Sequence, residues 1–157
     1  MIKQVKEKEQ TEFKLKKSKA NLRAIFDTTP QIYFLIDKDY KILTLNKNAR
    51  YLMKQLVDKE IAAGNNLLYY FPGHEQQYIR QSLAESFKGK YIHDERNDVF
   101  SGTDDKLYSI YFYPAYNELN EVFAVSFSLQ DITAIRHAGK QADNERKLLL
   151  TMINNMP

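Results

Sequence analysis

The sequence VFAVSFSL, residues 122–129, constrains the fold more than any other stretch of the chain. Large and small side chains alternate along it: Phe123, Val125, Phe127 and Leu129 against Ala124, Ser126 and Ser128. Successive side chains of a strand point to opposite faces of a sheet, so this alternation predicts a strand with one deeply buried face. A sheet covered on one side by helices would bury a strand in this way.

Four more strands are predicted around this one. Their ranges are 31–36, 41–45, 91–100 and 107–113, and turns are expected at 37–40, 101–105 and 117–120. Most of these runs alternate apolar and polar residues and are bounded by Asn, Asp or Gly. Together they predict a five-stranded antiparallel sheet.

Helices are predicted before, between and after the strands. Residues 1–28 hold good helix formers and end at Pro30, Asn46 is a candidate N-cap, and 74–88 end before Gly89. Loop or short helix is expected at 58–66, and a compact apolar turn at 67–71. The fold class is therefore α+β, with helices on one face of the sheet.

Composition excludes several classes of protein. The 157 residues are 43% hydrophobic, which supports one compact core. The chain has no Cys, so it has no disulfide, thiolate metal site or cysteine nucleophile. No apolar run reaches the roughly 18 residues of a membrane span, so no membrane contact is expected within this chain.

The positive charge is concentrated at the N-terminus. The chain carries a net +3, whereas residues 1–20 alone hold seven Lys against three Glu. Aromatic residues are not interleaved with these lysines, so we expect a solvated helix and not a nucleic-acid site.

The two ends of the chain share a pattern. Residues 22–30, LRAIFDTTP, align without gaps to residues 149–157, LLTMINNMP. Either two amphipathic helix ends are alike by chance, or a second copy of the domain begins here. Ile135, Ala142 and Leu149 also lie seven residues apart, as in a short coiled coil. We assign 1–24 to an N-terminal helix, 25–133 to the domain, and 134–157 to a linker helix with the start of a repeat.

Five ordered segments resemble the PAS family of sensory domains. Residues 32–42 are similar to its opening hairpin and 46–49 to the start of its first core helix. Residues 87–90, 114–116 and 125–133 resemble the end of its long helix, its last hairpin and its closing Asp-Ile-Thr. The resemblance covers roughly Ile25 to Thr133 and implies the PAS fold flanked by signalling helices.

The resemblance also implies a function. The chain would be a cytoplasmic sensor and dimerisation module of a bacterial signalling protein, free or membrane-anchored, that relays a signal to an output domain such as a histidine kinase. A homodimer would form through Phe13, Leu15, Leu22 and Phe26 and the outer face of the sheet. No catalytic arrangement is recognisable, so no enzyme activity is expected in this chain. A ligand-free structural spacer and an acid/base enzyme on a similar sheet are the alternatives.

Cofactor types known in the family can be compared with the residues present. Thiol-linked flavin or chromophore attachment is excluded because there is no Cys. Haem is not expected, because the long helix has only His74, at its start. His93 with Asp94, Glu95 and Asp98 could hold a hard cation, but a solvated strand is favoured and no metal site is predicted.

Matching the family pattern, eleven residues face the interior: Phe34, Ile36, Ile42, Ile79, Leu83, Tyr108, Ile110, Phe112, Val125, Phe127 and Leu129. They either fill the interior or line a site for a small apolar or aromatic ligand, with Tyr108 as the polar group. Asp131 and Thr133 are placed at the junction with the last helix, where either could cap it. In the family this junction transmits the signal.

Overall fold

The computed structural model describes residues 2–100 and 105–156. In chain order the elements are α1 (Ile2–Thr28), β1 (Ile32–Ile36), β2 (Ile42–Leu45), α2 (Lys47–Val57), the 3-10 helix η1 (Leu67–Tyr70), α3 (Gly73–Phe87), β3 (Ile92–Asn97), β4 (Leu107–Tyr116), β5 (Val122–Asp131) and α4 (Thr133–Asn154). This order confirms the predicted α+β class. Of the three turns predicted, the one at 101–105 lies mostly outside the described residues.

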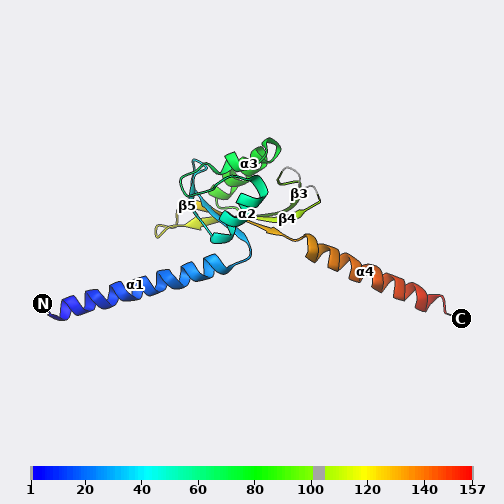
Figure 1. The fold of residues 1–157 in the computed structure, drawn as a ribbon, viewed down its shortest axis with the longest axis horizontal. Helices are drawn as coiled ribbons and strands as arrows, with labels where there is room; N and C mark the ends of the chain where they lie inside the picture. Colours follow the sequence, from blue (N-terminus) through cyan, green and yellow to red (C-terminus); the bar gives the residue numbers. More distant parts are fainter. Residues whose placement is uncertain (1, 101–104, 157) are drawn as a thin grey trace.

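The five strands form one antiparallel sheet in the order β2-β1-β5-β4-β3. The strand that the sequence marks as most deeply buried, β5, is the central one. Helices α2, η1 and α3 cover one face of the sheet, and the core lies between them and the strands (Figure 1). The other face is called the outer face below.

The predicted strands differ from the observed ones in three places. Phe123 was expected in the core but is 45% exposed, because it lies at the start of β5, beyond the last core residue Val125. Strand β4 continues through Pro114 to Tyr116, since β3 pairs only as far as Phe112 and leaves an open edge that tolerates proline.

Strand β3 is shorter than predicted. It ends at Asn97, and Asp98 then adopts a left-handed backbone with φ of 53°. The turn sends Val99 and Phe100 into the core, where they are 1% and 0% exposed. The sequence pattern alone placed both residues in a polar strand.

One buried side chain, Asn46, joins β1 to α2. Its Oδ1 accepts hydrogen bonds from the backbone N–H of Ala49 (3.0 Å) and of Tyr33 (3.1 Å), and its Nδ2 donates to the carbonyl of Gln31 (2.8 Å). The predicted N-cap is confirmed, and it also satisfies strand groups that would otherwise be buried without partners.

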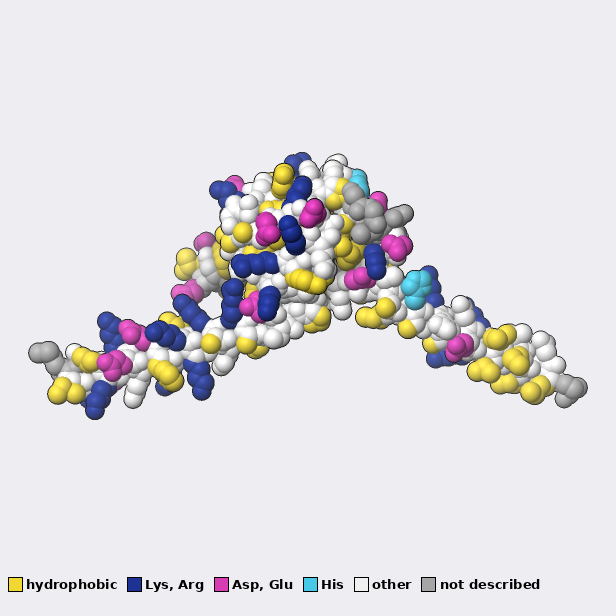
Figure 2. Space-filling view, in the orientation of Figure 1, with side chains coloured by type: hydrophobic (Ala, Val, Ile, Leu, Met, Phe, Trp, Pro, Cys, Tyr) yellow, Lys and Arg dark blue, Asp and Glu magenta, His cyan; other side chains and the backbone are white. Residues whose placement is uncertain are grey.

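The two terminal helices extend away from the sheet and its covering helices (Figure 1). Neither α1 nor α4 has a buried residue. Lys and Arg side chains follow α1, whereas hydrophobic side chains gather at the end of α4 (Figure 2). Among the described residues, none of the helices is both long enough and apolar enough to cross a bilayer.

Candidate functional site

All eleven residues predicted to face the interior are buried, and none is more than 4% exposed. Phe127 lies at their centre, with ring centroids 4.7 Å from Phe112 and 5.9 Å from Phe34. Phe71, which the sequence analysis left out of the set, packs 5.8 Å from Phe127 and 5.2 Å from Phe100. Aromatic rings therefore fill the middle of the space between sheet and helices.

A pocket of about 290 Å³ opens at one end of this core, between α2 and the sheet. We call it the α2–sheet pocket, and its lining residues are Pro30, Ile32, Leu52, Leu56, Lys106, Tyr108, Leu129, Gln130 and Asp131. Two of the eleven predicted residues, Tyr108 and Leu129, contribute to it. The pocket lies beyond the aromatic rings, where the strands reach the last turn of α2.

Strand register explains the pocket. Ile32 pairs with Leu129, and Tyr108 pairs with Asp131, two residues further along β5. Because side chains two apart share a face, Asp131 lies on the same inward face as Leu129. The inward face of β5 is therefore apolar up to Leu129 and charged at Asp131, where the strand ends.

Tyr108 lies at this boundary between apolar and charged groups. Burial, and to a smaller extent the carboxylates of Asp131 and Asp105, raises the pKa of its phenol to about 12. The side chain is 4% exposed and packs 5.5 Å from Phe100. At neutral pH its hydroxyl is therefore a hydrogen-bond donor.

An ion pair between a buried carboxylate and an arginine that is 34% exposed joins α3 to β3, and it was not predicted from the sequence. Glu75 is 1% exposed, and Arg96 binds it with two nitrogens: Nη2 to Oε1 at 2.8 Å and Nε to Oε2 at 3.1 Å. The hydrogen bond to Glu75 raises the pKa of Arg96. Glu75 lies four and eight residues before the buried Ile79 and Leu83, and this spacing was the available signal for a buried acid.

A second polar contact joins the same two elements. The Tyr78 hydroxyl donates to Asp94 Oδ2 at 2.5 Å, and the Arg96 guanidinium lies 3.9 Å from the centre of the Tyr78 ring. Burial and the bond to Asp94 raise the pKa of Tyr78. Asp94 and Arg96 are two apart on β3, so both point toward α3.

The predicted junction residues form hydrogen bonds between β4, β5 and α4. Asp131 Oδ1 accepts from the backbone N–H of Thr133 at 2.9 Å, and Thr133 Oγ1 accepts from the N–H of Leu107 at 2.9 Å. The N-cap of α4 is Ile132, which makes no side-chain cap bond, so the expectation that Asp131 or Thr133 caps this helix was wrong. The N–H of Ile132 donates to the Leu107 carbonyl at 2.9 Å. The start of α4 is thus fixed to the start of β4.

One further contact connects the first turn of α4 to β3. Arg136 Nη2 lies 2.5 Å from Glu95 Oε1. Glu95 is between Asp94 and Arg96, so it points to the outer face of the sheet while they point to α3. Strand β3 therefore contacts α3 on one face and α4 on the other.

Comparison with known families decides the identity of the fold. The model of a family described as "PAS fold" matches residues 26–137. The chain belongs to the PAS family. This match confirms the resemblance seen in the sequence, and the five-stranded sheet is that of a PAS sensory domain. A search of curated proteins found no match.

Solved PAS structures have the same fold. The PAS domain of Bordetella pertussis BvgS is 14% identical over 83% of this chain and 98% of its own, with a TM-score of 0.58. A sensory box sensor histidine kinase from Vibrio cholerae is 16% identical over 76% and 93% of the two chains, with a TM-score of 0.52. A phage VqmA–DPO complex is 14% identical over 85% and 61%, with a TM-score of 0.58.

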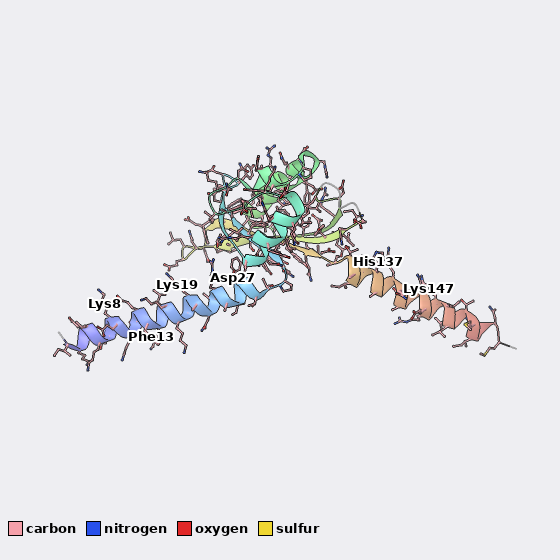
Figure 3. All side chains as sticks on the ribbon, viewed as in Figure 1. Lys8, Phe13, Lys19, Asp27, His137 and Lys147 are labelled. Carbon is pink, nitrogen blue, oxygen red and sulfur yellow. The ribbon has the colours of Figure 1, made fainter. Side chains whose placement is uncertain are left out.

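The side chains predicted for dimer contact lie on both sides of α1. Leu15 and Leu22 are seven residues apart and share a side of the helix, which Phe26 continues. Phe13 precedes Leu15 by two residues, about 200° around the helix, so it points away from that side. Figure 3 labels Phe13 on the part of α1 that extends from the PAS domain. Phe13, Leu15 and Leu22 are 69%, 56% and 67% exposed.

His93 makes contacts typical of a strand residue. Its Nε2 lies 2.7 Å from Ser109 Oγ, and its ring stacks 4.3 Å from that of Tyr111 on the outer face. Among residues 2–100 and 105–156, no three His, Cys, Asp or Glu side chains lie close enough to hold a metal ion. His74 contacts the carbonyl of Asp98 at 2.9 Å.

Proposed function

We propose that this PAS domain is a sensor and dimerisation module that relays a small-molecule or partner signal along α4 to an output domain, in a bacterial cytoplasmic signalling protein such as a histidine kinase. The observation that carries the proposal is the pair of contacts made by β3. Through Arg96 it is bound to α3, which covers the core, and through Glu95 it is bound to Arg136 of α4. A displacement of α3 would therefore move β3 and, through Glu95, the first turn of α4.

The junction at the end of β5 supports the same role. Thr133 and Ile132 bond to both polar backbone groups of Leu107, so the direction in which α4 leaves depends on where β4 begins. Signal relay needs an element with two arrangements whose balance a ligand can change. The contacts of α4 with the sheet are few and partly exposed, which supports the proposal that a ligand could shift this helix.

We expect the variants Arg136→Gln and Asp131→Ala to change the output of the full-length protein severalfold while the domain stays folded. Each removes one contact between α4 and the sheet, and contacts of this strength, about 1 kcal/mol, alter a two-state balance by about fivefold. The measurement is autophosphorylation of the full-length protein, with circular dichroism as the check on folding.

Arg146→Gln is the matched control, because Arg146 is on the same helix, is exposed, and makes no ion pair with another described residue. It should leave the output unchanged. Equal outputs from all three variants and the parent would refute the relay and favour a structural spacer.

The two long helices favour dimerisation. On α1, Leu15 and Leu22 form an exposed apolar side, and on α4 Ile135 and Leu149 are 65% and 59% exposed. An apolar groove of about 680 Å³ between the end of α1 and the sheet continues this side through Phe26. One second copy of the chain, arranged in parallel about a two-fold axis, could cover the apolar sides of both helices at once.

We expect Leu22→Asp to shift the chain from dimer to monomer, because it would bury two carboxylates at the contact. Phe13→Asp is the control, since Phe13 faces away from Leu22 and its replacement should leave the dimer intact. The measurement is analytical ultracentrifugation over a range of concentrations. A parent chain that stays monomeric throughout, or equal loss of dimer in both variants, would contradict this contact surface.

A further inference from the structure

The α2–sheet pocket combines an apolar wall with one charge of each sign. Ile32, Leu52 and Leu56 form part of the wall. At the rim, Lys106 Nζ lies 3.9 Å from Asp131 Oδ2, and the two side chains are 45% and 43% exposed. This separation exceeds the roughly 2.7–2.9 Å of a charge-assisted hydrogen bond, so the two groups are neighbours without being closely bonded.

A third polar group, the hydroxyl of Tyr108, belongs to a residue that lines the pocket and is 4% exposed. Among the described residues, the buried side-chain polar atom without a hydrogen-bond partner is Ser86 Oγ, so the Tyr108 oxygen keeps contact with solvent. A ligand acceptor in the pocket could take the place of water at this hydroxyl. Its raised pKa keeps the proton on the oxygen.

We propose that the α2–sheet pocket binds a free α-amino acid with an apolar side chain, such as leucine or phenylalanine. The carboxylate would accept hydrogen bonds from Lys106 and Tyr108, and the ammonium would donate to Asp131. The apolar side chain would lie against Leu52 and Leu56. This inference names a ligand for the sensory function proposed above, and it rests on that function for its role in signalling.

Charge balance favours a zwitterion over a simple acid or amine. A monocarboxylate at Lys106 would lie against Asp131, and an amine at Asp131 would lie against Lys106. A zwitterion replaces one loose ion pair by two complementary contacts. The pocket volume, about 290 Å³, is just below the roughly 300–1,000 Å³ of sites for larger ligands, which suits a molecule of this size.

A ligand in the α2–sheet pocket would act on α4 through Asp131. Its Oδ1 accepts from the N–H of Thr133 at the start of α4, while its Oδ2 faces Lys106. A ligand ammonium would take the place of Lys106 beside Oδ2. A ligand bound beside Oδ2 would therefore change the hydrogen bond that Oδ1 accepts at the start of α4.

The test is isothermal titration of residues 1–157 with L-leucine and L-phenylalanine, and with leucinamide and N-acetyl-leucine, which each lack one charge. We expect at least one amino acid to bind, and both leucine derivatives to bind at least about tenfold more weakly than leucine. Absence of binding by both amino acids at millimolar concentration, or equal binding of leucine and its derivatives, would overturn the proposal.

Variants locate the site. Lys106→Met and Tyr108→Phe should each weaken binding about three- to tenfold, and Leu56→Trp should abolish it by filling the pocket. Lys54→Met is the matched control: Lys54, on α2, lies 3.8 Å from Asp58 and 3.5 Å from Glu60 and is outside the pocket. An equal loss of affinity in Lys54→Met would show that the amino acid does not bind in the α2–sheet pocket.

Ligand binding and signal relay are tested by separate measurements. Binding is measured on the domain alone, whereas the relay is measured as output of the full-length protein. Absent binding combined with an altered output in Arg136→Gln would reject only the ligand. Binding combined with unchanged output in that variant would reject only the relay.

Discussion

Replacing Arg96 with Met is expected to lower the free energy of unfolding by about 3–5 kcal/mol, because the Glu75 carboxylate would stay buried without its cationic partner. Glu75 is 1% exposed and receives two nitrogens of one guanidinium at 2.8 and 3.1 Å. Chemical denaturation followed by circular dichroism measures the change.

A double variant separates the charge from the packing. Glu75→Leu combined with Arg96→Met removes both charges and should recover most of the lost stability, since paired apolar groups can replace a buried ion pair. Arg80→Met is the control, an arginine on the exposed side of α3. A loss below about 1 kcal/mol in Arg96→Met would show that the pair is not needed to hold β3 against α3.

Phe127→Ala is expected to lower the free energy of unfolding by about 3–5 kcal/mol, because it leaves a cavity at the centre of the core. Its ring contacts those of Phe34, Phe71 and Phe112 at centroid distances of 5.9, 5.8 and 4.7 Å. Phe123→Ala, on the same strand but 45% exposed, is the control and should change stability by no more than about 0.5 kcal/mol.

The same variant tests whether the core is filled. Apolar cavities made by truncation can bind benzene, so benzene should raise the melting temperature of Phe127→Ala and not that of the parent chain. An equal rise in the melting temperature of the parent chain would mean that an open cavity already exists among the rings. That outcome would favour the ligand site over the filled interior, the two alternatives left open by the sequence.

The parts of the fold that follow from local rules were predictable. Alternation along residues 122–129 identified the central strand, and Asn46 was recognised as an N-cap because its position before an apolar-periodic run requires one. What the pattern could not show is that the Asn46 side chain also bonds to β1, since that contact depends on how the two elements pack.

The parts that depend on long-range packing were missed. Arg96 lies in a strand that looks solvated from its sequence, because its partner Glu75 is 21 residues away on another element. Phe100 enters the core only because Asp98 turns the chain, which alternation does not encode. Three lining residues of the α2–sheet pocket were named from the sequence: Tyr108, Leu129 and Asp131. Lys106 comes close to Leu52 and Leu56 only because α2 packs against the sheet, which the sequence pattern does not encode.

The two edges of the sheet have a consequence for self-association through strands. At one edge, backbone groups of residues 64–67 bond to Tyr40 and Ile42, so the loop occupies positions that another strand could otherwise take. At the other edge, β3 carries the charged side chains of Asp94, Glu95 and Arg96, and an incoming strand would have to remove water from them. Both edges thus discourage growth into fibrils.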